Sequence, residues 1–445
     1  MKNLRDRIAD NKDRFIAELS MLCSQKSISA KNEGVAECAH MIVDMLKKRG
    51  FQAEVWELEG SFPAVYGYLP GASDRSLLFY GHYDVVPAEP LEKWDYPPFT
   101  PTLVGDVLYG RGVGDHKSSF VERLHAVDLL LEEGELPVGI KFFLEGEEEL
   151  GSPNLSRMIA AHREELKADA SLYVGGFRND AGRIQIRLGK KGNLAVELSA
   201  VTMAKDSLSY RAAILPNAAW RLVRALSTMI DENDRCTIDG FQELVQKPTP
   251  QEAALVESIP FSEQDVCRAF GIDNLNGGLS GVDASMAEVF DPVAVLCKLS
   301  AGFPGEGFKA VLPSSAKAHL EFQLVPDQTP ENVLRLIREH LDRRGFSDIQ
   351  IKVINSLQVG KTPADARIAQ VVVDTAREVY GEEPVVIPLG GGAGPWELLF
   401  NIGMPIVSEP GVSHAGSNYH APNENIRVSD YLLGVEHIAM LIKNF

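Results

Sequence analysis

Apolar and polar positions along the 445-residue chain follow two different styles. Near the N-terminus apolar residues recur every three to four positions, which predicts amphipathic helices over residues 4–25 and 33–49. Strand-length apolar runs then alternate with helical patterns, and this order is typical of an α/β layer with a mostly parallel sheet. The segments predicted here are strands 53–58, 76–84, 138–146 and 170–175, with helices 118–133 and 153–166.

The pattern changes after residue 184. Residues 184–200 alternate as strands, a helix follows from Pro216, and a long polar stretch occupies 232–275. Two later strands enclose a helix that opens at Thr329, and strands interleaved with two helices indicate a small α+β sandwich of about ferredoxin type. The α/β style then resumes, with helices 365–380, 395–401 and 428–443 and strands 384–390 and 405–411. We therefore expect an α/β domain (1–187 and 359–445) interrupted by an inserted domain (188–358).

Composition narrows the choice of partner and compartment. The 44 basic and 62 acidic residues leave a net charge of −18, which disfavours nucleic acid or an anionic membrane as a partner because both need basic surface. The five cysteines are scattered, as expected of reduced thiols, and the charged start MKNLRDRIAD lacks the apolar core of a signal peptide. These features predict a cytoplasmic protein, and they say little about its small-molecule substrate.

Candidate chemistry gathers in four segments: GHYDVVP, GRGVGDHKS, EGEEELGS and SHAGSNYHAPNEN. In a parallel α/β sheet, functional groups collect at the carboxyl ends of the strands. His82 and Asp84 share a face of a strand, and a carboxylate often orients a metal-binding imidazole. Structural alternatives exist, because Asp115 could cap the following helix and the run of glutamates could be a solvated helix start. Four such segments in one domain nevertheless favour a metal centre.

These segments, in this order, resemble the zinc exopeptidase and amidohydrolase family of aminoacylase, carboxypeptidase G, acetylornithine deacetylase and carnosinase-type dipeptidases. The resemblance covers nearly the whole chain. It implies a mostly parallel-sheet catalytic domain interrupted by a smaller ferredoxin-like lid domain, through which we expect a homodimer. It also implies that Glu147 is the general base and that Asp84 orients the ring of His82. Asp115 is expected to bridge two metal ions and to be followed by a cis peptide bond. The expected metal ligands are His82, Asp115, Glu148 and His420.

Carboxylate and imidazole ligands suit Zn, Mn or Co, but this chain departs from the family at three places. The remaining carboxylate ligand of the first ion aligns with Gly175 or Gly176, and Asp180 is the nearest alternative. We therefore expect one or two divalent ions, with one tight site favoured. The lid histidine aligns near Leu208, and no histidine occurs from 163 to 318; the arginine that clamps a substrate carboxylate aligns near Leu389.

The functional hypothesis is hydrolysis of a carbon–nitrogen bond by metal-activated water. The three departures favour a non-peptide substrate, such as an N-acyl, ureido or aromatic amine compound, over an ordinary dipeptide. A catalytically silent binding protein is the alternative of another class. A nucleotide-binding interpretation of GRGVGD and LGGGAG lacks the required strand and helix context. Candidate substrate contacts are His116, Arg211, His414 and Asn418, and His414 could equally be an ordinary surface residue.

Overall fold

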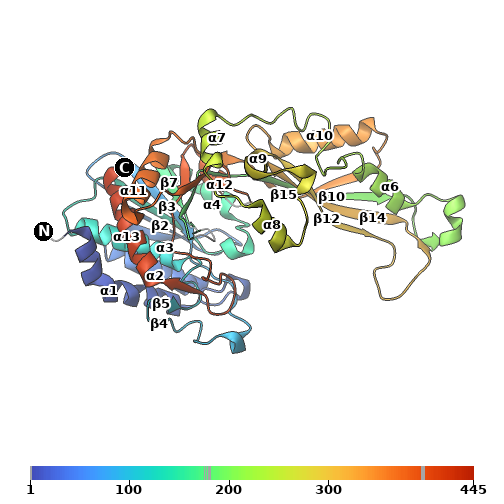
Figure 1. Cartoon of the computed structure of the whole chain (residues 1–445). Coiled ribbons are helices and arrows are strands. Elements are labelled where there is room, and N and C mark those ends of the chain that lie inside the picture. The colour runs from blue at the N-terminus through green and yellow to red at the C-terminus, as the bar shows by residue number, and fades with distance from the viewer. Residues whose placement is uncertain (1–2, 175, 177, 179–181, 392–395) are drawn as a thin grey trace. The chain divides into compact units, whose positions relative to one another are not determined.

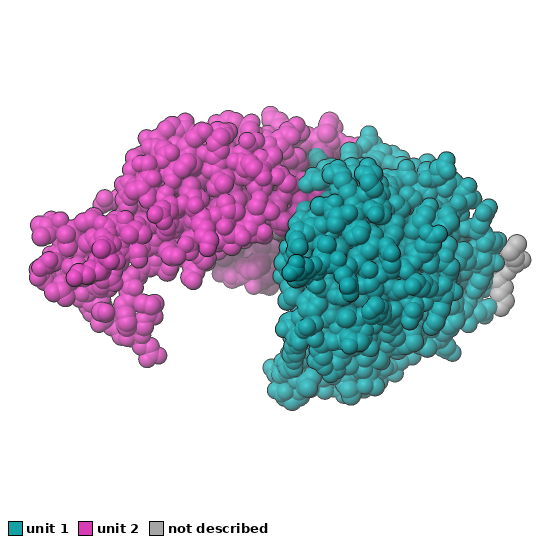
Figure 2. Space-filling model, turned by 180° about the vertical axis from the view of Figure 1, so that it is seen from behind, with its two compact units in different colours: residues 1–189, 361–388, 398–445 teal, residues 190–360, 389–397 magenta. Residues whose placement is uncertain are grey.

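The computed structural model describes residues 3–174, 176, 178, 182–391 and 396–445. The chain divides into two compact units, which Figure 2 shows in different colours. Unit 1 contains residues 1–189, 361–388 and 398–445, and unit 2 contains residues 190–360 and 389–397. The structural divisions at 189 and 360 lie close to the breaks expected after 187 and 358. The short segment 389–397 belongs to unit 2, which the sequence did not indicate.

Unit 1 is built on a six-stranded sheet in the order β1-β2-β6-β3-β7-β18. Figure 1 labels three of these strands, β2, β3 and β7. The pairs β6–β3, β3–β7 and β7–β18 are parallel, which confirms the expected α/β fold with a mostly parallel sheet. Strand β2 was not predicted, and both it and β1 run antiparallel to their neighbours. The strands of this sheet are β1 (Gln52–Trp56), β2 (Ala64–Leu69), β3 (Ser76–His82), β6 (Gly139–Glu145), β7 (Ala170–Tyr173) and β18 (Ile406–Ser408).

Helices pack against this sheet and against one another. Helix α1 begins after Asn3, whose side chain caps it by accepting a hydrogen bond from the amide of Asp6, and its apolar stripe is buried. Helix α3 is buried on almost every side because it contacts α1, α13 and strand β3. The helices of unit 1 are α1 (Leu4–Ser24), α2 (Val35–Lys47), α3 (Lys117–Leu131), α4 (Leu155–Ala161), α5 (Arg163–Leu166), α11 (Arg367–Tyr380) and α13 (Val428–Asn444), and α12 (Trp396–Phe400) starts in the segment assigned to unit 2.

The sheet register brings the candidate segments together. Strands β3 and β6 are neighbours and end side by side, with His82 opposite Glu145. The polar segments that follow these two strands therefore begin at the same edge of the sheet. Smaller ladders complete unit 1: β4 (Thr102–Val104), β5 (Val107–Tyr109) and β19 (Asn425–Arg427) form one sheet, and β8 (Gln185–Arg187) pairs in parallel with β17 (Val385–Ile387).

Unit 2 contains a four-stranded antiparallel sheet in the order β12-β14-β10-β15. Helices α6 and α10 pack on it, and the shared core includes Leu222, Phe322 and Ile337. The chain order strand–helix–strand–strand–helix–strand is that of a ferredoxin-like sandwich, as expected. These elements are β10 (Gly192–Val201), α6 (Ala218–Leu226), β12 (Val293–Ala301), β14 (Ser315–Leu324), α10 (Pro330–Arg343) and β15 (Gln350–Leu357), with the short pair β11 (Ser207–Leu208)–β13 (Val311–Leu312). The two-residue strands β9 (Gly189–Lys190) and β16 (Gly360–Lys361) also pair, and the divisions between the units fall within them.

The long polar stretch 232–275, for which the sequence analysis predicted no helix, contains helices. They are α7 (Pro250–Glu257) and α8 (Glu263–Phe270), and α9 (Gly281–Phe290) follows. Helix α7 starts with a capping box, in which the Thr249 side chain accepts from the amide of Glu252 while the Glu252 side chain accepts from the amide of Thr249. Among the described residues, no helix combines the length and apolar character needed to cross a membrane.

Candidate metal centre

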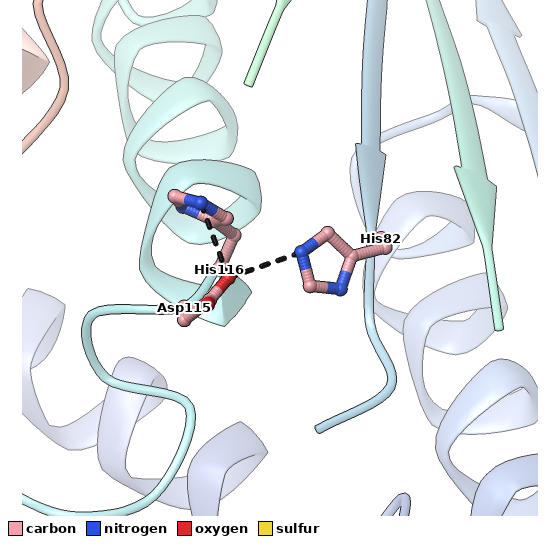
Figure 3. Close-up of side chains that lie close together, drawn as sticks. All are labelled: His82, Asp115 and His116. Atoms are coloured by element: carbon pink, nitrogen blue, oxygen red, sulfur yellow. Dashed lines mark hydrogen bonds and ion pairs between the residues drawn. The ribbon is translucent and has the colours of Figure 1, made fainter. Parts of the chain in front are cut away.

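Two groups of metal-type ligands share one carboxylate, that of Asp115. Its Oδ1 lies 3.2 Å from Nε2 of His82 and 3.1 Å from Nε2 of His116 (Figure 3). Its Oδ2 lies 2.9 Å from Nε2 of His420, and that same nitrogen is 3.2 Å from Oε2 of Glu149. Each oxygen of Asp115 therefore faces a separate set of donors, and we call this arrangement the Asp115 centre. All of its residues belong to unit 1.

His82 is the last residue of β3, and Asp84 holds its ring. The Nδ1 atom of His82 lies 3.1 Å from the backbone carbonyl oxygen of Asp84 and 3.4 Å from its Oδ1. The Asp84 carboxylate in turn accepts hydrogen bonds from the amides of Glu148 and Glu149. With Nδ1 held by these oxygens, Nε2 is the ring nitrogen directed at Asp115 and is the atom that would bind a metal ion. Asp84 also ties the end of β3 to the turn that follows β6.

The loop that carries Asp115 is held by a residue that sequence reasoning missed. Glu424 is fully buried and its carboxylate accepts hydrogen bonds from the amides of Gly112, Gly114 and Asp115. It also receives a 2.6 Å bond from Nη1 of Arg111. The available signal was the segment HAPNEN itself, in which Glu424 stands four residues after His420. The Asp115–His116 peptide bond is cis, as expected.

Electrostatics bind the histidines and carboxylates of this centre together. Burial alone would lower the pKa of His82, but the negative charges of Glu148, Asp115 and Asp84 raise it well above its usual value. Burial raises the pKa of Glu149 to about 7, helped by the negative charge of Asp115 and opposed by His82. The hydrogen bond to Asp115 raises the pKa of His420 to about 9. Negative charge is therefore concentrated here and is offset only in part by imidazoles.

The three consecutive glutamates have different positions in the structure. Glu147 accepts hydrogen bonds from the amides of Phe62 and Asn154 and from Nδ2 of Asn154, so both of its carboxylate oxygens hold the surrounding loop. The structure places Glu149, and not the expected Glu148, in the group with Asp115 and His420. Glu148 begins the short 3-10 helix η3 (Glu148–Leu150), and its charge acts on the buried His82. The run EEE carries no periodic signal that could have fixed this register.

Of the four candidate substrate contacts, only His116 has a described contact with this centre. Arg211 is exposed in unit 2. His414 uses both ring nitrogens within its own loop, with Nε2 3.2 Å from Oδ1 of Asn425 and Nδ1 accepting from the amide of Gly416. Asn418 is exposed and its side chain reaches only the carbonyl oxygen of Asn423 among described partners. Gly175 and Asp180 lie outside the described residues.

The donors of the Asp115 centre fit divalent transition metal ions. Imidazole nitrogen with carboxylate oxygen is the donor set that Zn, Mn and Co accept. The described ion pairs of Asp115 and Glu149 are all with histidines, so no lysine or arginine neutralises either carboxylate there. Oε1 of Glu149 is buried and has no hydrogen-bond partner among the described residues. Fold and donor set together fit a metal-dependent hydrolase.

Comparison with known proteins agrees with this class. Residues 78–444 match the model of peptidase family M20/M25/M40, and the chain belongs to that family. The Cys-Gly metallodipeptidase dug1 of Schizosaccharomyces pombe is 25% identical over 465 residues, which cover 98% of this chain and 96% of the relative. The probable di- and tripeptidase DUG2 of Saccharomyces cerevisiae is 24% identical over 95% of this chain, which spans about half (49%) of that relative.

Solved structures show the same fold over the full length. The M20 family metallo-carboxypeptidase Sso-CP2 from Sulfolobus solfataricus superposes with a TM-score of 0.85 at 33% identity, covering 97% of this chain and 98% of its own. Human carnosine dipeptidase 1 superposes with a TM-score of 0.73 at 21% identity, covering 98% of this chain and 97% of its own. The expected resemblance to metal-dependent exopeptidases is thereby confirmed.

Proposed function

We propose that the chain hydrolyses the peptide bond of short peptides with divalent metal ions held at the Asp115 centre. The observation that carries the proposal is the shared Asp115 carboxylate, one oxygen of which faces His82 and His116 while the other faces His420. The names of the relatives, a Cys-Gly dipeptidase and a metallo-carboxypeptidase, support a peptide substrate over other amides. A divalent metal ion at such a centre supplies Lewis acidity, polarising a carbonyl and making water more acidic.

Within this scheme Glu148 takes the role that the sequence assigned to Glu147. Both carboxylate oxygens of Glu147 accept hydrogen bonds from Phe62 and Asn154, which leaves that side chain committed to the loop. Glu148 adjoins the proposed ligand Glu149, and its charge raises the pKa of the buried His82 against the effect of burial. Glu148 therefore accepts the proton of the attacking water and returns it to the leaving amine nitrogen.

The supporting residues act by position. Asp84 fixes the ring of His82, and Glu424 fixes the loop that presents Asp115. Glu149 replaces Glu148 as the proposed ligand that pairs with His420. In metal sites, such outer hydrogen bonds set the orientation of the ligands and their affinity for the ion.

A second candidate is a non-peptide amide, ureido compound or aromatic amine, and Leu389 supports it. Where the family resemblance places an arginine that clamps a substrate carboxylate, Leu389 is buried and packs in an apolar cluster with Val256 and Phe290. A leucine offers no bidentate bond to a free peptide carboxylate. Substrates that lack this carboxylate would then lose nothing at that position.

The decisive test is a substrate panel run on one purified preparation. The protein is stripped with chelator, reloaded separately with Zn, Mn and Co, and assayed on dipeptides, N-acyl amino acids, ureido acids and aminoaromatics. We expect dipeptide hydrolysis that vanishes on stripping and returns with metal. Turnover confined to the non-peptide compounds would favour the second candidate. Bound metal without turnover on any of them would favour the silent binding protein.

A matched pair of variants tests the proton acceptor. Glu148→Gln is expected to lower kcat by about 10²–10⁴-fold with metal content unchanged, because only proton transfer is lost. Glu147→Gln is expected to lower the melting temperature while retaining most of the turnover, because its hydrogen bonds hold the loop. If Glu147→Gln alone abolished turnover without loss of melting temperature, Glu147 would be the base.

The homodimer through unit 2 and the cytoplasmic location remain predictions.

A further inference from the structure

Among the residues that the structure describes, one side of the Asp115 centre has no carboxylate at the place where the family resemblance led us to expect one. Gly176 has no side chain to supply it, and a Cβ atom added there would lie 1.9 Å from the backbone oxygen of Glu409. A side chain at this position would therefore require the backbone around Glu409 and Pro410 to move. His82 and one oxygen of Asp115 would by themselves give an ion only two protein donors, which is fewer than the usual three.

His116 occupies the space beside these two donors. Its Nε2 lies 3.1 Å from Oδ1 of Asp115, the same oxygen that Nε2 of His82 approaches at 3.2 Å. The ligand atoms of His82, Asp115 and His116 all lie within 4.8 Å of one another, and all three residues are buried. Figure 3 shows both rings directed toward the Asp115 carboxylate, one from the end of strand β3 and the other from the start of helix α3.

The two separations from Oδ1 of Asp115 are close to those of atoms that share a cation. Ligand atoms about 2.1 Å from a tetrahedral zinc ion are roughly 3.4 Å apart, since they sit at the corners of a tetrahedron. The ring of His116 is also fixed, because it packs edge-on against His82, with ring centroids 5.3 Å apart, and against Tyr419 at 5.5 Å. Although His116 is the N-cap of helix α3, its side chain makes no capping hydrogen bond. Helix capping therefore does not account for its position.

We propose that His116 is a metal ligand, which with His82 and Asp115 completes a first ion site of two imidazoles and one carboxylate. This inference rests on the proposed metal centre and changes its composition. The two sites are then unlike: His82, His116 and Asp115 hold one ion, and Asp115, Glu149 and His420 hold the other. Two imidazoles and a single shared carboxylate give the first site the lower negative charge. This role as a metal ligand replaces the substrate contact that the sequence analysis expected of His116.

Metal binding by single variants tests the assignment without reference to activity. Full-length protein is stripped, titrated with Zn²⁺ and with Co²⁺ at fixed pH, and analysed for metal content per chain. His116→Ala and His82→Ala are both expected to lose the same one equivalent, or to bind it at least roughly 100-fold more weakly, the upper end of the effect of removing an outer-shell partner. Glu149→Ala is expected to lose the other equivalent. The visible spectrum of the Co²⁺ protein identifies which ion each variant has lost.

The controls separate ligand loss from misfolding and from loss of the enzyme itself. His40→Ala removes an exposed histidine of helix α2 and should bind both ions as the wild type does. His116→Asp restores an oxygen donor and should recover the lost equivalent with a changed Co²⁺ spectrum. Two equivalents bound by a folded His116→Ala variant with wild-type affinities would overturn the proposal, even if turnover had fallen. An inactive wild type that still shows this pattern would contradict only the proposed function.

Discussion

Among its described residues, unit 1 contains two clusters with nearly the same residue types. The Asp115 centre joins carboxylates to histidines at the ends of strands, while Glu18, His125 and Asp128 meet between helices α1 and α3. In the second cluster Arg49 donates 2.7 Å and 2.6 Å bonds to Glu18 and Asp128. No such guanidinium pairs with the described carboxylates Asp115 and Glu149. Geometry alone therefore does not define a metal site. The second cluster differs from the first because an arginine pairs with its carboxylates, whereas the described ion pairs of Asp115 and Glu149 are with histidines only.

The largest expected effect comes from removing the shared carboxylate. Asp115→Asn should bind neither ion tightly and should lose turnover, because Oδ1 and Oδ2 serve both groups. Asp128→Asn is the matched control, since it changes the same residue type in the arginine-compensated cluster. Elemental analysis after gel filtration measures both. Equal metal content in Asp115→Asn and the wild type would remove the distinction between the clusters.

A smaller effect is expected from the loop that presents Asp115. Glu424→Gln places an amide NH₂ among the backbone amides of Gly112, Gly114 and Asp115, where a carboxylate now accepts. We expect metal affinity to fall by about 10–100-fold, the usual result of disturbing an outer partner. Competition with a chromogenic chelator gives the dissociation constants. Unchanged affinities would show that the loop keeps its position without Glu424.

Substitution in the second cluster is expected to change metal content least and to lower the free energy of unfolding. Burial would raise the pKa of Glu18, but hydrogen bonds from His125 and Arg49 lower it to about 2. A lowered pKa contributes stability that is complete above the unfolded value near 4.5 and is lost as the pH falls toward 2. Glu18→Gln should therefore lower the free energy of unfolding at pH 7 by about 1–3 kcal/mol, with metal content unchanged.

Urea unfolding at pH 7, 5 and 3.5 tests this dependence. The difference in free energy of unfolding between wild type and Glu18→Gln should narrow as the pH falls below 4.5. Below that pH the wild-type carboxylate loses the stability that its lowered pKa contributes. A gap that stayed constant down to pH 3.5 would contradict the assigned ion pairs. Metal loss in Glu18→Gln would show that the guanidinium of Arg49 does not exclude a cation from this cluster.

Sequence patterns predicted the fold where periodicity was strong. The parallel strands and the amphipathic helices were visible because burial on one face leaves a regular spacing. Strand β2 and helices α7 to α9 were missed. The start of α7 is marked by the capping pair of Thr249 and Glu252 and not by an apolar period. The residues of β2 (AVYGYL) likewise follow no clear period.

The sequence predicted which segments form the candidate site, but not which of their side chains face one another. His82 and Asp84 lie side by side as predicted, although β3 ends at His82 and Asp84 follows the strand. The run Glu147–Glu149 offers three identical side chains, and only the turn after β6 decides which one points toward His420. His116 lay next to a predicted ligand, yet its position against Asp115 depends on the backbone of a loop held by Glu424. Such contacts between distant segments leave no local trace in sequence.

One measurement tests the metal centre most directly: anomalous diffraction from a crystal of the zinc-loaded protein, collected on both sides of the zinc absorption edge. We expect two peaks, one bounded by His82, His116 and Asp115 and one by Asp115, Glu149 and His420, with none between Glu18 and Asp128. Peaks absent from both sides of Asp115, or a peak in the arginine-compensated cluster, would contradict the account.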